Sequence, residues 1–194
     1  MKLLQITKWI LSFLAVLAIQ PVYAATEQYT LDDSHSYVGW QISHFGFSHP
    51  SGKWMATGTL ELDKDSPQKS KVNVTINVAD FITGIPKLDE HLKGEEFFDV
   101  AKYPTATFVS NKVTVTGKDT AKVQGDLTLH GVTKPVTLNV KLNKADVSPI
   151  SKKMTAGFTA TAIINRSDFG IKAYLPGLGD EVKLNIEVEA YKAS

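Results

Sequence analysis

The chain has 194 residues, of which 43% are hydrophobic and 21% are charged, with a formal net charge of +1 and no cysteine. The lack of cysteine excludes disulfides and thiolate metal sites. Lysines interspersed among acidic residues give no cationic patch suited to nucleic acid, so we expect no nucleic-acid partner.

Residues 1–24 have the pattern of a secretory signal peptide. Lys2 and Lys8 precede an uncharged, mainly apolar run over residues 9–19, and Ala24 is a small residue suited to cleavage. The run is shorter than the roughly 20 apolar residues of a membrane span, although an uncleaved N-terminal anchor is the alternative. We therefore expect a periplasmic or secreted protein without a stable membrane anchor, with residues 25–194 forming one domain.

Alternation of apolar and polar residues predicts β-strands along most of this domain. The expected strands cover residues 38–42, 58–62, 72–78, 103–110, 112–116, 121–130, 136–146, 154–164 and 181–191. Between the third and fourth strands, Pro86 is followed by Leu88 and Leu92 on one face, which predicts a short helix over 86–93. Such an all-β pattern fits a barrel or a sandwich, and we favour a closed barrel because closure leaves no exposed strand edge.

Short motifs in a specific order carry a resemblance to a known family. They are Asp33-Ser34-His35-Ser36, Asp89-Glu90-His91-Leu92, Phe97-Phe98-Asp99, Lys102-Tyr103-Pro104-Thr105-Ala106-Thr107-Phe108, the amphipathic hairpin 123–140, and Asp168-Phe169-Gly170-Ile171. Through them the chain resembles the YceI-like lipid or polyisoprenoid-binding proteins over essentially all of residues 25–194.

The resemblance implies an all-β, eight-stranded antiparallel, lipocalin-like barrel with one short helix and an enclosed apolar tunnel. The implied ligand is a small hydrophobic molecule with a long chain, such as a polyisoprenoid, an isoprenoid quinone or a fatty-acid derivative. The protein would then be a carrier, store or scavenger rather than an enzyme, with no cofactor apart from the bound lipid. A homodimer is compatible with this reading. The alternatives are an enzyme acting on a lipid head group and a structural barrel with a filled core.

Small residues on inward faces favour a tunnel over a filled core. An eight-stranded barrel is just wide enough for either arrangement. The inward row 154–162 contains Ala156, Ala160 and Ala162, and Gly125 falls on a comparable face of the hairpin. We expect these positions to leave room for ligand.

The residues expected to contact the ligand are apolar, aromatic or small. From the predicted strands, the helix and the segment before the second strand they are Trp40, Ile42, Trp54, Leu60, Leu88, Leu92, Phe108, Gly125, Leu127, Phe158 and Ala160. The expected walls and lids are Phe45, Phe47, Phe81, Ile85, Phe97, Phe98, Phe169, Tyr174, Leu175 and Leu178. Gly177 and Gly179 flank Leu178 in a run expected to gate one mouth.

None of the five histidines has zincin spacing, so we expect no metal site. His44 is in register with Ile42 and is expected to face inward and hydrogen-bond a ligand head group. His35 and His130 are expected to point away from the apolar side.

Two further polar groups have simple structural interpretations. Ser34 and His35 would point to opposite faces of a regular strand and could not act as nucleophile and base, so turn capping is preferred. Arg166 and Asp168 would share a face if extended, and we expect them to help close one barrel end.

Overall fold

The computed structural model describes residues 26–193, so the expected signal peptide lies outside the described part of the chain. The ten strands are β1 (Glu27–Leu31), β2 (Tyr37–His44), β3 (Ser51–Met55), β4 (Thr57–Leu62), β5 (Lys71–Asn77), β6 (Thr105–Val115), β7 (Thr120–Leu129), β8 (Val132–Val147), β9 (Met154–Asn165) and β10 (Leu178–Lys192). The helical segments are α1 (Pro86–Leu92) and 3-10 turns at Pro67–Lys69, Val78–Asp80 and Arg166–Phe169. Within residues 26–193, no helix has the length and apolar character needed to cross a bilayer.

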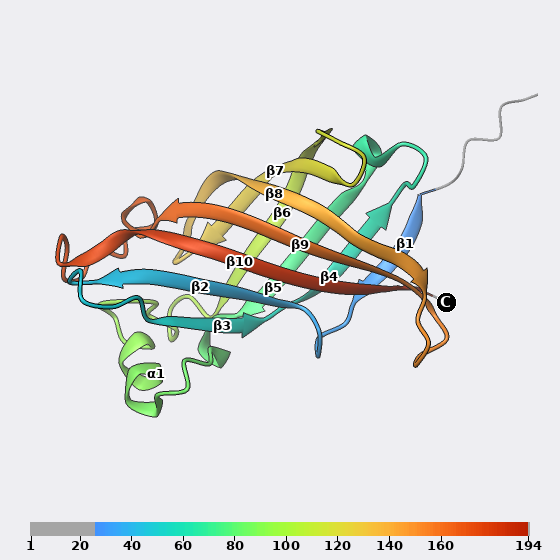
Figure 1. The fold of residues 1–194 in the computed structure, drawn as a ribbon. Helices are drawn as coiled ribbons and strands as arrows, with labels where there is room; N and C mark the ends of the chain where they lie inside the picture. The colour runs from blue at the N-terminus through green and yellow to red at the C-terminus, as the bar shows by residue number, and fades with distance from the viewer. Residues whose placement is uncertain (1–25, 194) are drawn as a thin grey trace, which may run out of the picture.

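The strands form a closed antiparallel barrel, with α1 outside one end (Figure 1). Neighbouring strands follow the order β1-β4-β5-β6-β7-β8-β9-β10, and β1 pairs with β10 to close the ring. Strand β10 pairs with β1 only near Ala190, and from Leu178 to Glu187 its same edge pairs with β2. Strands β2 and β3 therefore extend the barrel wall beyond the end of β1. The prediction of a closed eight-stranded antiparallel barrel with one short helix is confirmed.

Three details of the strand prediction were wrong. The expected strands 103–110 and 112–116 are one strand, β6, in which the register shifts between Ser110 and Lys112. Such a shift reverses the alternation of faces and therefore resembles a strand break in the sequence. Strands β1 and β3 were not predicted, because β1 is short and β3 follows residues typical of a loop, including Pro50.

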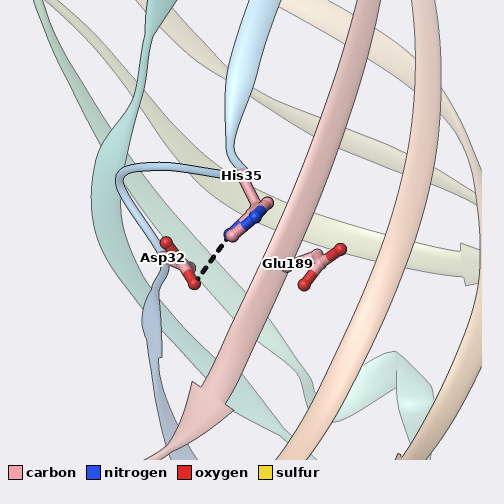
Figure 2. Close-up of side chains that lie close together, drawn as sticks. All are labelled: Asp32, His35 and Glu189. Atoms are coloured by element: carbon pink, nitrogen blue, oxygen red, sulfur yellow. Dashed lines mark hydrogen bonds and ion pairs between the residues drawn. The ribbon is translucent and has the colours of Figure 1, made fainter. Parts of the chain in front are cut away.

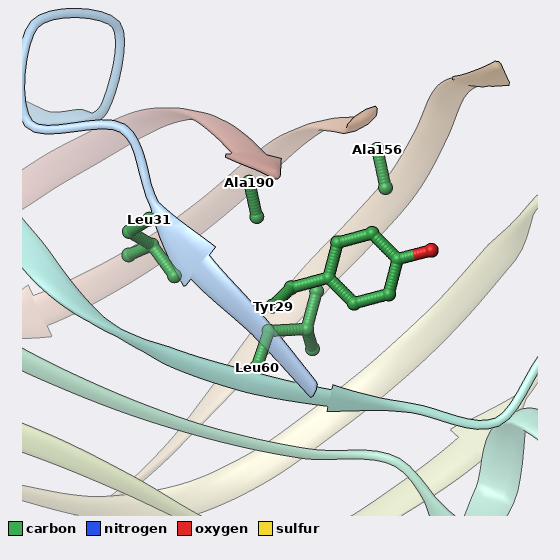
Figure 3. Packing of buried hydrophobic residues seen from close by; sticks show 5 residues of the cluster. All are labelled: Tyr29, Leu31, Leu60, Ala156 and Ala190. Carbon is green, nitrogen blue, oxygen red and sulfur yellow. The ribbon is translucent and has the colours of Figure 1, made fainter. Parts of the chain in front are cut away.

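Side chains fill the barrel at the end where β1 meets β10, which we call the closed end (Figure 3). The Tyr29 ring packs there with Leu31 and Leu60, beside the small side chains of Ala156 and Ala190. Tyr29 is almost fully buried, and its hydroxyl donates a hydrogen bond to Glu27 (2.9 Å). The alanine expected to leave room for ligand at position 156 therefore accommodates the tyrosine ring.

Candidate functional site

A pocket of about 540 Å³ lies inside the opposite end of the barrel, which we call the mouth end. At this end β2 finishes and β10 begins, and His44 pairs with Leu178. The volume falls within the range of about 300–1,000 Å³ that is usual for small-molecule sites. The open space is thus a pocket in one half of the barrel, while the closed end is packed.

Many of the sequence-predicted site residues lie together in the wall of this pocket. They are Trp40, Ile42, His44, Phe45, Trp54, Leu88, Leu92, Phe97, Phe98, Leu127, Tyr174 and Leu178. His44 was expected to face inward from its register with Ile42, and both side chains do line the pocket.

The other predicted residues lie outside the pocket wall. They are Phe47, Leu60, Phe81, Ile85, Phe108, Gly125, Phe158, Ala160, Phe169 and Leu175. Leu60 and Phe158 belong to the closed-end core, and Phe47 and Ile85 are exposed. A Cβ atom at Gly125 would lie 2.5 Å from the Phe108 ring, so this glycine allows Phe108 to pack instead of giving passage to ligand.

The pocket wall also contains residues that were not among the expected ligand contacts. They are Val38, Ser48, Pro50, Ile76, Val78, His91, Ala106, Leu129, Ile164, Arg166, Ile171, Val182 and Leu184. Those in strands follow the alternation already used to assign inward faces, so strand parity could have identified them. Those in loops and in α1 depend on chain paths that alternation does not predict.

Two tryptophans form one side of the pocket. Their ring centroids are 6.2 Å apart, and the Trp54 indole donates a hydrogen bond to the Val78 carbonyl oxygen (3.1 Å). Trp54 also packs edge-on against Phe98 at 5.3 Å between centroids. A Cβ atom at Gly52 would lie 2.7 Å from the Trp40 ring, so the absence of a side chain at position 52 lets that ring lie across β3.

Arg166 holds the loop before β10 against the pocket. Its side chain is buried, and its guanidinium donates to four backbone carbonyl oxygens. The acceptors are Gly179 (2.7 Å), Ile171 (3.1 Å), Ala173 (2.8 Å) and Leu178 (3.0 Å). Residues 166–169 form a 3-10 turn, so Arg166 and Asp168 do not lie in an extended segment. The arginine fastens a wall of the pocket.

Asp180 adds a second fastening for the same loop. Its carboxylate accepts hydrogen bonds from the backbone N–H (2.9 Å) and the hydroxyl (2.7 Å) of Ser167. Burial lowers the pKa of Arg166, and the charge of Asp180 opposes that shift. Four of the five N–H groups of the Arg166 guanidinium bond to carbonyl oxygens of the loop, so the arginine is a positioning residue for the wall.

The mouth of the pocket carries aromatic side chains and a few polar groups. Phe97 stacks on Tyr174 with 6.1 Å between centroids, and His91 packs edge-on against Phe97 at 4.9 Å. His44 and Ser48 also line the pocket at this end. The arrangement suits an apolar chain whose polar end remains near the mouth.

A separate polar cluster lies at the closed end, where the β1–β2 turn meets β10 (Figure 2). His35 Nδ1 lies 3.0 Å from a carboxylate oxygen of Asp32, and the ligand atoms of these residues and Glu189 lie within 4.8 Å of one another. The hydrogen bond that His35 makes to the Asp32 carboxylate raises the pKa of His35, as do the charges of Asp32 and Glu189. Among the described residues this is the group whose atoms could approach one divalent cation.

The same turn contains Ser34, for which turn capping was expected. Residues 33–35 form a turn and not a regular strand, and the Ser34 N–H donates to Asp32 (2.9 Å). The Ser34 hydroxyl donates to Asp33 (3.3 Å), so it is not paired with His35. Turn capping describes these contacts, with Asp32 as the main acceptor.

The YceI-like domain model matches residues 29–190. This match includes part or all of each of the ten strands and every residue that lines the pocket. The chain belongs to the YceI-like family. The resemblance seen in the sequence motifs is thereby confirmed.

Close relatives in this family are UPF0312 proteins from Pseudomonas. One from P. putida strain W619 is 39% identical over 180 residues, which cover 92% of each chain. One from P. syringae pv. tomato is 40% identical over 159 residues, covering 81% of this chain and 82% of the relative.

Solved structures of other proteins share the fold. The YceI protein of Campylobacter jejuni is 30% identical with a TM-score of 0.71, covering 78% of this chain and 90% of that one. BcnA of Burkholderia cenocepacia has a TM-score of 0.74 at 24% identity, covering 82% of this chain and 98% of its own. A polyisoprenoid binding domain from Saccharophagus degradans has a TM-score of 0.63 at 17% identity, covering 85% and 98% of the two chains. At 24% and 17% identity, the last two comparisons show a shared fold and nothing more.

Proposed function

We propose that this YceI-like protein binds a long-chain apolar molecule in the mouth-end pocket and acts as its carrier, store or scavenger. The observation that carries the proposal is a pocket of about 540 Å³ with a mainly apolar wall inside a closed barrel. A polyisoprenoid, an isoprenoid quinone or a fatty-acid derivative has the required chemistry. The S. degradans neighbour is a polyisoprenoid binding domain, which agrees with this ligand class.

Burial of the chain supplies the affinity in this proposal. Each five-carbon isoprene unit gains about 4 kcal/mol from burial, before the costs of association are subtracted. The polar groups of His44, Ser48, His91 and Tyr174 lie where they can orient a head group. Binding and release do not require a chemical step, so we propose a binding protein and not an enzyme.

We also propose that the protein is exported. The basic start, the apolar run and Ala24 within residues 1–24 support a signal peptide, and the protein would then work in the periplasm or outside the cell. In that location a carrier shields an apolar chain from water.

Intrinsic fluorescence provides a direct test with a defined isoprenoid. After removal of residues 1–24 the remaining tryptophans are Trp40 and Trp54, and both line the pocket. Farnesol is expected to bind saturably with one molecule per chain and to change the tryptophan emission. Titration of lipid-stripped protein measures the affinity.

A matched pair of variants makes this test specific. Ala106 lines the pocket, whereas the adjacent Thr105 is exposed on the same strand. We expect Ala106→Phe to weaken farnesol binding at least about tenfold by filling the pocket, while Thr105→Phe leaves it unchanged. Circular dichroism checks that both variants are folded. Equal affinities for the two folded variants would contradict the proposed site.

A further inference from the structure

Two loops at the mouth end expose large apolar side chains to solvent. Phe45 and Phe47, in the loop after β2, are 49% and 92% exposed. Tyr174 and Leu175, in the loop before β10, are 53% and 36% exposed. We call these four residues the mouth rim. Phe45 and Tyr174 also line the pocket, so the rim continues directly into its wall.

The two loops form one surface because they are joined by backbone contacts. The Phe45 N–H donates to the Gly177 carbonyl oxygen (2.9 Å), and the Phe45 ring lies where a Cβ atom at position 177 would be. In Figure 1 both loops project together beyond the same end of the barrel, at the left of the view. The rim is thus a single apolar edge built from two distant parts of the sequence.

The backbone holds two rim residues in a costly conformation. Phe45 has φ of 51° and Tyr174 has φ of 59°, in the left-handed region that larger residues seldom occupy. Strained positions of this kind persist where the surrounding structure fixes them, and they occur often at functional sites. Here the strain accompanies side chains that lie between the pocket and the solvent.

The charge of the loops adds a second constraint on what the rim contacts. Residues 44–51 and 170–179 contain neither aspartate nor glutamate, and Lys172 is their one lysine. These two loops, with aromatic and aliphatic side chains, no carboxylate of their own and one lysine, match the chemistry of the membrane–water interface.

We propose that the mouth rim docks on the surface of a lipid bilayer, so that an apolar chain passes between the membrane and the pocket without crossing water. The inference rests on the proposed function, because a bilayer is where a long apolar ligand resides. A bilayer explains why the exposed side chains surround the entrance to the pocket, an arrangement that a partner elsewhere on the barrel would not require.

Vesicle sedimentation tests this docking with a matched control. Vesicles of phosphatidylcholine and phosphatidylglycerol are the probe, and the double variant Phe47→Ser with Leu175→Ser removes apolar surface from each loop. The control is Ile150→Ser, because Ile150 is 91% exposed in the β8–β9 turn at the closed end. We expect the double variant to partition roughly tenfold more weakly than the wild type, and Ile150→Ser to partition as the wild type does.

The outcomes separate this proposal from the proposed function. Equal partitioning of the folded double variant and the wild type overturns the docking proposal, even where farnesol binding is intact. A wild type that dimerises in analytical ultracentrifugation, together with a double variant that is monomeric and partitions unchanged onto vesicles, would assign the rim to a second copy and also overturn the docking proposal. Ala106→Phe is expected to reduce farnesol binding and to keep full vesicle partitioning, since it alters the pocket and not the rim. If wild-type protein partitions through the rim but binds no farnesol, the docking stands and the proposed ligand class fails.

Discussion

At the residue scale, Arg166 is the side chain on which the pocket wall most depends. We expect Arg166→Met to lower the free energy of unfolding by about 3 kcal/mol, because four carbonyl oxygens lose a charged donor. The loop over residues 171–179 should also become more susceptible to proteolysis. Urea denaturation and limited proteolysis measure these effects, and Lys172→Met, on the exposed part of the same loop, is the control. A loss below about 0.5 kcal/mol for Arg166→Met would contradict this role.

The roles of individual residues could be predicted only where strand alternation determines them. His44 was correctly expected to face inward, because its parity with Ile42 is a local property. Gly125 was assigned to ligand passage, but its contact with Phe108 depends on a ring from the neighbouring strand. Arg166 was expected to help close one barrel end, but the turn that aims it at four loop carbonyls could not be read from spacing.

At the scale of elements, β1 closes the barrel and is held by side-chain ion pairs as well as by its backbone pairing in the sheet. Glu27 accepts hydrogen bonds from Lys192 (2.6 Å) and Tyr29 (2.9 Å), and it forms an ion pair with Lys64 (3.0 Å). These contacts lower the pKa of Glu27 from 4.5 to about 2, and the hydrogen bond from Lys192 makes the largest contribution. They join the first strand to the last strand and to the turn after β4.

This pKa shift predicts how acid affects the closure. The folded form binds the proton more weakly than the unfolded form, so the stabilisation by Glu27 is fully present above pH 4.5 and is lost as the pH falls towards 2. Glu27 is partly exposed, so the contribution is at most about 1 kcal/mol. We expect Glu27→Gln to lose less stability than the wild type between about pH 6 and about pH 3 in urea denaturation. Equal losses would contradict the role of this carboxylate.

The strand pattern itself was predictable for the long strands and not for the short ones. Strands β7 to β10 alternate over many residues, and the predicted ranges overlap them closely. Strand β3 has five residues and includes Gly52. A glycine is needed there because the Trp40 ring occupies the space of a Cβ atom, which the sequence alone does not reveal. The break predicted inside β6 reflects a bulge, which changes the facing of side chains without ending the strand.

At the scale of the whole molecule, the two barrel ends have different contents. The closed end contains Tyr29 among small side chains, whereas the mouth end keeps a pocket whose entrance is bordered by exposed apolar residues. The sequence predicted a barrel with room inside but not which half remains open. That division depends on where a side chain from the unpredicted β1 packs. A barrel filled at one end and open at the other suits a ligand that enters and leaves by one route.

The central claim is that the pocket holds a long-chain apolar molecule. The most direct measurement is native mass spectrometry, with organic extraction, of wild-type protein and Ala106→Phe purified from the host. We predict about one apolar molecule per wild-type chain and clearly less in the folded Ala106→Phe variant. Wild-type protein without a stoichiometric apolar ligand, or equal occupancy in the two proteins, would contradict the claim.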